Sequence, residues 1–316
     1  MPSILTHQYF ADQLLLQYNK TWPFLSKHIP VVWVGSQGPD PFFFFGKAPF
    51  KKRLGQQTIN AFGSTLHNQL PVKSIAPLLK QGWYSGKKDE VRQAYVFGAL
   101  SHYVLDRVCH PYVFYRSGFD DQGQLTGFFS ADHARLEVEI DLGLSQKLKL
   151  SSKHYQPKNT LKIDSLSLSH VSELYAKAFE KDLNLDTYRQ AVEDMRSTYQ
   201  FLYHGSWLNR LLVILLAGKR SLPYSLIHPI KLKETIANRA MNTARKTWYH
   251  PVTKVASRQS FIQLMDEALT LFASLIPLLQ ADTFDEKKWR AFTQGIDYDG
   301  KIYQTKMSHQ DSYYQP

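Results

Sequence analysis

The sequence predicts an all-α protein, and three observations support that fold class. Apolar residues recur every three or four positions through most of the chain, which is the period of an amphipathic helix. Gly, Pro and Asn residues separate these segments. Polar and apolar residues rarely alternate, and only residues 161–169 read as an extended segment. With 316 residues, of which 43% are hydrophobic, the chain is large enough to bury a substantial core.

The first half of the sequence predicts four helices. The first begins near Ser3 and ends near Tyr18, and the later ones follow the same apolar period. After the first helix, residues 34–46 combine glycines and prolines that predict an irregular loop. Asp40 stands between two prolines of this loop, on a stiff piece of backbone. The later helices are expected over residues 56–69, 91–110 and 130–147.

The second half predicts further amphipathic helices, which are separated from the first half by a polar stretch. That stretch, residues 151–165, is the best candidate for a linker. We therefore expect two parts, residues 1–150 and a C-terminal helical extension over residues 151–316 that packs on them. The helices of the second part are expected over residues 167–182, 185–204, 206–217, 232–246 and 257–280.

The composition and the apolar runs of the sequence indicate in which cellular compartment the protein is expected. A single cysteine, Cys109, excludes an internal disulfide and favours a reducing compartment, so we expect a cytoplasmic protein. The longest apolar run, residues 211–217, is much shorter than the ~20 residues of a membrane-spanning helix. The first residues lack the basic and apolar regions of a signal peptide. We expect neither a transmembrane segment nor secretion by that route.

The chain is basic, with a formal net charge of +11 and a pI near 9.4. Such a charge favours anionic partners, among them phosphates, anionic lipid and nucleic acid. A basic surface without a specific partner explains the charge equally well, because Lys and Arg are spread along the whole sequence. The charge alone therefore names no partner.

Ligand-type side chains are concentrated on two of the predicted helices. Residues four apart lie on the same face of a helix, so each helix carries a stripe of imidazoles and carboxylates. Buried without partners, such groups would cost several kcal/mol each. The alternative is that these residues share a helix face by chance and make hydrogen bonds within the core. The other residues of the first helix are apolar, however, so its polar stripe is expected to face the interior, which favours metal binding. The stripes consist of His102, Asp106, His110, His133, Glu137 and Asp141.

The residue types indicate the metal. Histidines and carboxylates without thiolates suit zinc or another borderline divalent ion. One tetrahedral zinc ion cannot use all these ligands, so more than one ion is expected. Of the remaining histidines, His28, His154, His204 and His309 have no partner at helical spacing, and a surface or core role is the better interpretation for them.

At this point the chain resembles the zinc-dependent phospholipase C family, which shares its fold with the S1/P1-type nucleases. The resemblance covers about residues 1–145 and is specific as an ordered set, although each motif alone is weak. It implies a multi-helix bundle with zinc ions in a cleft among the helices. The motifs are His7, the loop Gly38-Pro39-Asp40-Pro41, Leu66-His67, His102-x3-Asp106 ending in His110-Pro111, and His133-x3-Glu137 with Asp141 one turn later.

The resemblance implies a ligand set for two to three zinc ions. By the family's pattern, one ion would be held by Asp40, His67, His102 and Asp106, and a second by His110, His133 and Glu137. A third would be held by His7, by Asp106 as a bridge and by the terminal amine. Removal of Met1 would leave Pro2 as the first residue; retention of Met1 or an empty third site are equal alternatives.

Two features depart from the family's pattern. His110 follows Asp106 by four residues, whereas the secreted enzymes place the corresponding histidine six residues on. The tryptophan that those enzymes use as first residue is missing. The chain therefore resembles an intracellular, uncharacterised branch of the family.

The activity that the resemblance implies is hydrolysis of a phosphodiester by a metal-activated water. Phospholipids are among the substrates that contain such a bond. Asp40 would be both ligand and general base, by resemblance and because its loop is stiff. Two alternatives remain. One is a non-catalytic zinc-binding or interaction protein that keeps the site for stability. The other is a P1-type nuclease, whose binding to nucleic acid the basic charge would suit, although we consider nucleic acid a less favoured partner than a phospholipid.

The aromatic run Phe42–Phe45 follows Asp40-Pro41 and precedes a basic stretch that contains Lys47 and Arg53. This arrangement is compatible with peripheral membrane contact, in which rings enter the lipid interface and lysines meet phosphates. The alternative is a core plug beneath a basic surface. We expect two of the rings in the core and two lining the cleft.

Overall fold

A computed structural model describes residues 4–48, 53–85, 89–117, 129–151, 154–180, 183–203, 207–219, 221–228 and 232–302. It confirms the all-α fold class, because helices account for most of these residues. The only sheet in the described chain is a two-stranded antiparallel hairpin in which Trp248 is opposite Ser257.

The helices of the first half match the expected ones closely and add several short turns. They are α1 (Ile4–Tyr18), α2 (Phe24–Lys27), α3 (Ile29–Gly35), α4 (Pro41–Phe44), α5 (Gln56–His67), α6 (Pro71–Ser74), α7 (Ala76–Leu78), the π-helical turn η1 (Leu79–Trp83), α8 (Glu90–Arg116) and α9 (Phe129–Lys147).

The second half contains the expected helices and elements that the sequence did not indicate. They are α10 (Pro157–Thr160), α11 (Ser165–Ala178), α12 (Thr187–Leu202), α13 (Trp207–Ala217), α14 (Leu222–Ser225), α15 (Glu234–Ala240), β1 (Trp248–Tyr249), β2 (Ala256–Ser257), α16 (Phe261–Leu279) and α17 (Glu286–Thr293).

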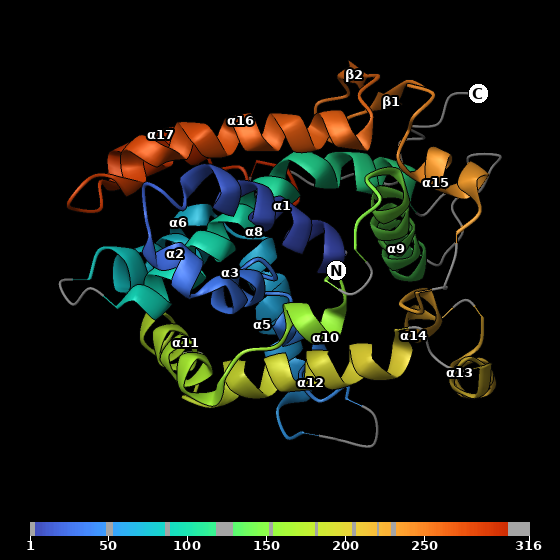
Figure 1. Cartoon of the computed structure of the whole chain (residues 1–316), viewed down its shortest axis with the longest axis horizontal. Coiled ribbons are helices and arrows are strands. Elements are labelled where there is room, and N and C mark those ends of the chain that lie inside the picture. The colour runs from blue at the N-terminus through green and yellow to red at the C-terminus, as the bar shows by residue number, and fades with distance from the viewer. Residues whose placement is uncertain are drawn as a thin grey trace.

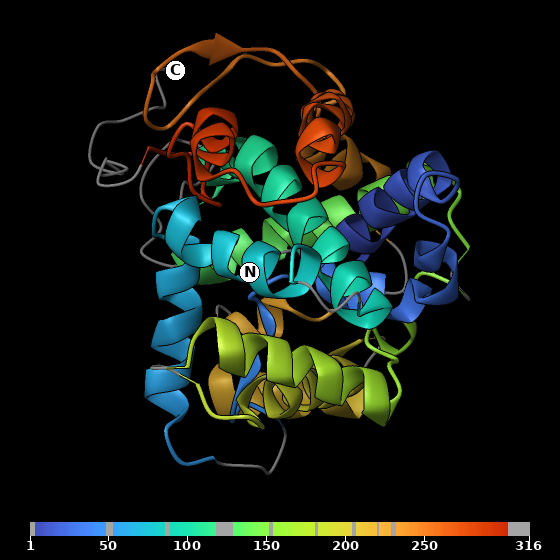
Figure 2. The same ribbon diagram turned by 90° about the vertical axis from the view of Figure 1, so that its left-hand side faces the viewer.

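Helix α8 is the central element of the molecule. Figure 1 shows α16 along one side, α12 along the opposite side, and α1, α3 and α8 between them. The same layering is visible after a 90° turn, where α16 and α17 lie above α8 and the α11–α12 pair lies below it (Figure 2). Helix α8 packs closely against α3 and α16, and α12 packs against α4. The main core includes residues of both halves of the chain.

Helix α8 is longer than expected. Asp89 caps its first turn by accepting hydrogen bonds from the backbone N–H groups of Val91 and Arg92. We expected an end at His110-Pro111, but the helix continues through Pro111 to Arg116. A proline removes one N–H from the helix, and the burial of Tyr112 and the rest of the last turns offsets that loss.

The extended segment expected over residues 161–169 is wrong. Helix α11 begins at Ser165, because the Asp164 side chain accepts a hydrogen bond from the Ser167 N–H at 2.9 Å and caps the helix. The Ser-Leu alternation imitated the period of a strand. In the helix, this stretch buries Leu168.

The polar stretch 151–165 is packed where it is described. It contains α10, and the Thr160 hydroxyl donates to Gln8 Oε1 at 2.6 Å. Leu161 is buried as well. The stretch therefore contacts α1 closely, and the division of the chain at residue 150 stays a prediction.

The loop expected over residues 34–46 is partly helical. Helix α3 ends at Gly35, turns follow over residues 36–40, and Pro41 begins the short α4. Proline suits the first position of a helix, where its missing N–H has no partner in any case.

Helix α16 is long and apolar enough to cross a membrane by length and composition alone. Phe272 and Leu275 of this helix are fully buried in the core. A core helix passes the same test of composition, so the expected absence of a transmembrane segment stays a prediction.

Candidate metal centre

The eight side chains expected to bind metal are buried and form one contiguous cluster. Helix α8 supplies the central stripe, α9 the neighbouring stripe, α1 and α5 one histidine each, and the turn before α4 one carboxylate. Within the cluster, three groups each bring their ligand atoms within 4.8 Å of one another. The cluster consists of His7, Asp40, His67, His102, Asp106, His110, His133 and Glu137.

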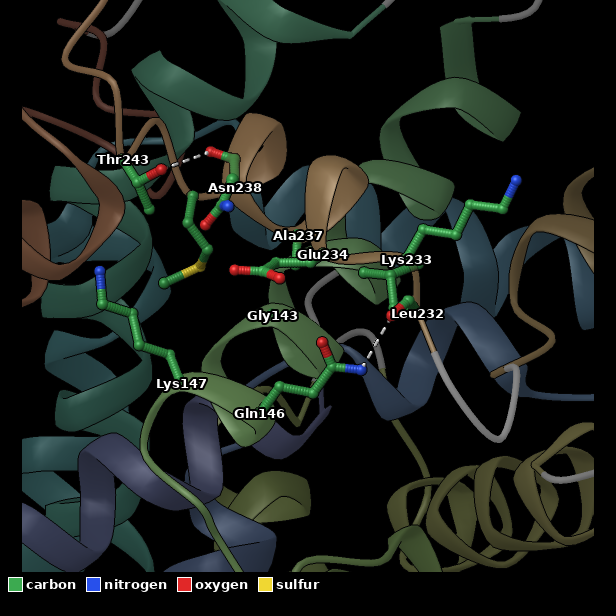
Figure 3. Close-up of a pocket in the computed structure, with 10 residues that line it drawn as sticks. Gly143, Gln146, Lys147, Leu232, Lys233, Glu234, Ala237, Asn238 and Thr243 are labelled. Carbon is green, nitrogen blue, oxygen red and sulfur yellow. Dashed lines mark hydrogen bonds between the residues drawn. The ribbon is translucent and has the colours of Figure 1, made fainter.

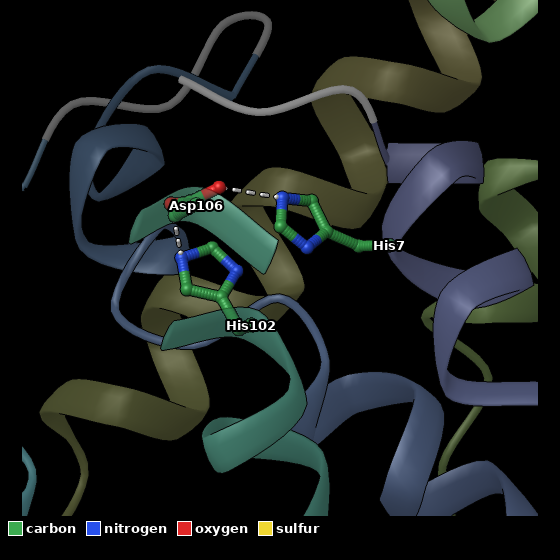
Figure 4. A group of neighbouring side chains, drawn as sticks. All are labelled: His7, His102 and Asp106. Carbon is green, nitrogen blue, oxygen red and sulfur yellow. Dashed lines mark ion pairs between the residues drawn. The ribbon is translucent and has the colours of Figure 1, made fainter. Parts of the chain in front are cut away.

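The first group joins α1 to α8 and consists of His7, His102 and Asp106 (Figure 4). Asp106 lies between the two imidazoles: its Oδ1 is 3.1 Å from His7 Nε2, and its Oδ2 is 3.0 Å from His102 Nε2. The two rings stack with their centroids 4.3 Å apart. Asp106 is thus placed to use both carboxylate oxygens on different neighbours.

The second group consists of Asp40, His67 and His102, so His102 belongs to two groups. Asp40 Oδ1 lies 3.0 Å from His67 Nε2 and 3.9 Å from His102 Nε2. The approach of this loop to His102 requires a glycine at position 38. A Cβ on Gly38 would lie 2.4 Å from the His102 ring, and its φ of +51° is a conformation that side chains disfavour.

The third group joins α8 to α9 and consists of His110, His133 and Glu137. Glu137 Oε1 lies 3.0 Å from His133 Nε2 and 3.6 Å from His110 Nε2. His110 Nε2 is also 3.7 Å from Asp106 Oδ1. The four-residue spacing of His110 therefore still brings this histidine to both the first and the third group.

Three of the histidines have a fixed orientation. The Nδ1 atoms of His102, His67 and His110 each lie within hydrogen-bonding distance of a backbone carbonyl, to which an Nδ1–H donates. Their Nε2 atoms point at carboxylates, and such an Nε2 must either carry a second proton or bind a cation. The carbonyl partners are those of Ser36 at 3.0 Å, Gly63 at 2.9 Å and Tyr298 at 2.8 Å.

Buried polar atoms without hydrogen bonds show that the cluster fits a metal. Both carboxylate oxygens of Asp40 are buried and accept no hydrogen bond from the described residues, as is also true of Asp106 Oδ2. Such atoms are costly to bury unless a cation satisfies them. A cavity of about 20 Å3, lined by His7, Asp106 and His110 among others, lies within the cluster. It has room for one small ion or water.

The electrostatic field in the cluster favours cations. Burial alone would lower the pKa of His110, but Asp106, Glu137 and Asp299 offset it and raise that pKa to about 10. Burial would raise the pKa of Asp106, and the surrounding imidazoles, with His102 foremost, instead hold it well below its usual range. Carboxylates that stabilise an imidazolium so strongly also favour a divalent ion at the same place.

Two residues near the C-terminus reach the cluster and were not expected from the sequence. The buried ring of Tyr298 lies against His67 and His102, with centroids 5.1 and 5.6 Å away, and its carbonyl orients His110. Asp299 Oδ1 is 3.6 Å from His110 Nδ1. The short acidic stretch around Tyr298 gives no periodic signal, and a backbone carbonyl leaves no trace in a sequence.

Three buried tyrosines support the loop that carries Asp40. The Tyr95 hydroxyl donates within a cluster formed with the hydroxyls of Tyr175 and Tyr188, at 2.9 and 2.7 Å. All three hydroxyls lie within 3.4 Å of the Gly38 carbonyl. These tyrosines come from α8, α11 and α12, so both halves of the chain hold this loop in place.

Asp141, the last residue of the second stripe, belongs to none of the three groups. Its carboxylate accepts hydrogen bonds from the backbone N–H groups of Leu5 and Thr6, at 3.1 and 2.7 Å, and from the Thr6 hydroxyl. Asp141 therefore caps the first turn of α1 and positions His7 instead of binding a metal.

The aromatic run after Asp40 is buried more completely than expected. Phe42, Phe44 and Phe45 are in the core, and only Phe43 is half-buried. The Phe43 ring lies 5.0 Å from the His67 ring. One half-buried phenylalanine, and not the expected two, therefore lies beside the metal ligands.

Parts of the sequence-based expectations fall outside the described residues. The terminal amine, expected as a ligand of the third zinc ion, belongs to residues 1–3, which the structure does not describe. His204 and His309, for which no metal role was expected, also lie outside the described residues. The role of the amine stays a prediction.

A larger cavity of about 780 Å3 lies between α9 and α15, where none of the eight ligands lines it. Its walls combine polar and apolar residues. Gln146 donates to the Leu232 carbonyl across one side, and Thr243 donates to the Asn238 carbonyl on the other (Figure 3). This cavity is therefore separate from the metal centre.

Comparison with known proteins agrees with the geometry. The sequence model of the family described as zinc dependent phospholipase C matches residues 6–262, which contain all eight ligands. Comparison with curated proteins and with solved structures found no match. The match covers most of the chain, and we conclude that the protein belongs to the zinc dependent phospholipase C family.

Proposed function

We propose that the protein is a zinc-dependent hydrolase of phosphodiesters and that its substrate is a phospholipid. Membership of the family and the three groups of histidines and carboxylates support a zinc-dependent hydrolase. The observation that carries the proposal is the contiguity of the groups, with Asp106 and His102 shared between neighbours. Paired metal sites of this kind are typical of phosphodiester hydrolysis.

Two to three zinc ions would be held by the cluster. Asp40, His67, His102 and Asp106 would hold one ion, and His110, His133 and Glu137 a second. His7 and Asp106, with the terminal amine, would hold a third. Zinc at such a site supplies Lewis acidity, which polarises phosphoryl oxygens and makes water more acidic.

Asp40 is the residue that we assign as general base. It is fully buried, and neither of its carboxylate oxygens is engaged in a hydrogen bond by the described residues. One oxygen faces His67 and His102, which leaves the other to accept a proton from an attacking water. The tyrosine hydroxyls near the Gly38 carbonyl support the loop that carries this carboxylate.

The test is hydrolysis of a chromogenic phosphodiester with and without metal. We expect a chelator to abolish hydrolysis and zinc to restore it. Asp40→Asn should lower kcat by roughly 10²–10⁴, the usual contribution of a general base, and lose much less of the bound zinc. Full activity of Asp40→Asn would place the base elsewhere.

Substrate panels separate the proposed activity from its competitors. Hydrolysis of phosphatidylcholine supports the phospholipid, whereas preferential hydrolysis of single-stranded nucleic acid would indicate a P1-type nuclease. Stoichiometric zinc without hydrolysis of any phosphodiester would indicate a structural or interaction role.

For the compartment we propose the cytoplasm, which the single, buried Cys109 supports.

A further inference from the structure

Helix α13 exposes an unusual number of leucines. Leu215 and Leu216 are 73% and 79% exposed, and Leu208, Leu211 and Leu212 are also exposed. Helix α13 lies beside α14 and the end of α12 (Figure 1). A contiguous apolar patch of this kind marks an interaction site more often than a surface without function.

An apolar groove of about 470 Å3 opens beneath this patch, between α4, α12, α13 and α14. Its volume is within the range of small-molecule pockets. Thr198 and Lys47 are the polar residues in its lining. The remaining lining is aliphatic or aromatic and includes Phe44, Phe201, Leu202, Val213, Leu216 and Leu226.

The groove borders the metal centre through one residue, Phe43. Phe43 lines the groove and its ring also lies 5.0 Å from the ring of His67. Lys47, three residues after Phe44, is the one charged residue in the lining and is exposed at its edge. An apolar groove with one cation in its lining thus lies next to the metal centre, with Phe43 between them.

We infer that this groove holds one alkyl chain of the substrate, an anionic or zwitterionic phospholipid, while the phosphodiester lies at the metal centre. The inference rests on the proposed function and adds to it a preference for substrates with a long chain. Burial of each methylene against apolar walls stabilises the complex, and Lys47 supplies the one positive charge in the lining, which favours a lipid that carries a phosphate. The leucines of α13 extend the same apolar surface toward a lipid interface.

The occupant follows from the lining of the groove and from its contact with the metal centre. A second copy of the chain would need a complementary ridge and would gain nothing from the neighbouring metal ligands. A lipid amphiphile matches both places: its alkyl chain fits the groove, and its single phosphodiester fits the cluster, with the charge of Lys47 nearby in the lining.

The test compares monomeric hexylphosphocholine and octylphosphocholine as ligands of the full-length, zinc-loaded protein. The two probes differ by two methylenes, each worth about fourfold in affinity when buried. We expect calorimetry to show that the octyl compound binds about 16-fold more tightly. Leu216→Gln and Ala217→Trp, which change exposed residues of the groove, should reduce this ratio toward one.

Leu166→Gln is the matched control, because Leu166 is 71% exposed and lies on α11, outside the groove. It should keep the affinity ratio of the unchanged protein. Hydrolysis of a chromogenic phosphodiester without an alkyl chain should be unchanged in Leu216→Gln, since that variant leaves the metal ligands intact.

The outcomes separate the inference from the proposed function. Equal affinity for both probes in the unchanged protein, with hydrolysis intact, would overturn the groove and keep the function. A chain-length ratio that Leu216→Gln abolishes, without hydrolysis of any phosphodiester, would keep the groove and overturn the function. A dimer that Leu216→Gln dissociates, with no dependence on chain length, would assign the groove to a second copy and overturn the inference.

Discussion

Asp106 is the residue that couples the three ligand groups. Its carboxylate contacts His7 through one oxygen and His102 through the other, and it also approaches His110. These imidazoles keep the pKa of Asp106 well below its usual range, so the carboxylate is charged at neutral pH. Removing that charge would leave several buried groups without their common partner.

We therefore expect Asp106→Ala to lose at least one of two to three bound zinc equivalents. A bridging carboxylate serves two ions, and neither neighbouring histidine can replace its charge. Elemental analysis of the purified protein measures the zinc content directly. His154→Ala is the control: His154 pairs with Asp12 outside the cluster, and its loss should leave the zinc content unchanged.

A purified Asp106→Ala variant with undiminished zinc would contradict the bridging role. Absence of any transition metal from the unchanged protein after mild purification would contradict the metal centre as a whole.

The ligands could be predicted from the sequence, whereas the residues that orient them could not. His102, Asp106 and His110 show themselves by four-residue spacing on a helix. Their orientation depends on the carbonyls of Ser36 and Tyr298, which are backbone groups available to any residue type. Contacts made by the backbone across long stretches of chain have no signature in residue identity.

At the scale of elements, the crossing of α3 and α8 decides where His102 lies. A Cβ on Gly98 would be 2.3 Å from the Val32 carbonyl and 2.8 Å from the Ser36 N–H nitrogen. The two helices can approach this closely only because residue 98 has no side chain. The same approach brings the Ser36 carbonyl to His102 Nδ1.

We expect Gly98→Ala to lower the free energy of unfolding by about 2–3 kcal/mol, because overpacking a tight contact forces backbone shifts. The displaced α3 should also weaken zinc binding at His102. Thermal unfolding with and without zinc measures both effects. Gln93→Ala, a half-buried position on the same helix, should change stability much less; equal losses in the two variants would show that the crossing has no special role.

Helix existence was predictable from apolar periodicity, but helix ends and short elements were not. The caps decide them: Asp164 starts α11 inside a stretch that alternates like a strand. Burial carries α8 past Pro111, against the local preference of proline. Pairing of β1 with β2 depends on two residues per strand, which is too short for a periodic signal.

At the scale of the whole molecule, residues 296–302, the last that the structure describes, return to the metal centre. Tyr103 donates a hydrogen bond to the Ile296 carbonyl at 2.7 Å, and Ile296 forms a bridge with Ile302. Between these residues, Tyr298 packs on two ligands and orients a third. This loop lies beyond residue 262, where the family match ends, so part of the support for the ligands comes from outside the matched region.

Two shortened chains test this support. A chain that ends at residue 295 keeps α16 and α17 and loses the Tyr298 loop, whereas a chain that ends at residue 302 keeps the loop. We expect the shorter chain to bind zinc at the His110 group roughly 10–100-fold more weakly, the usual effect of removing the partner of a metal-binding histidine. The longer chain should bind zinc as the complete protein does.

Zinc titration in the presence of a competing chelator gives the affinities, and circular dichroism shows whether both chains are folded. A variant of the complete chain, Tyr298→Phe, shows whether the hydroxyl of Tyr298 contributes, because it keeps the aromatic ring and the backbone carbonyl. If these two features carry the support, Tyr298→Phe should bind zinc normally while the chain ending at 295 does not. Equal zinc affinity in a folded chain ending at 295 would show that α1, α5, α8 and α9 suffice to hold the metal centre.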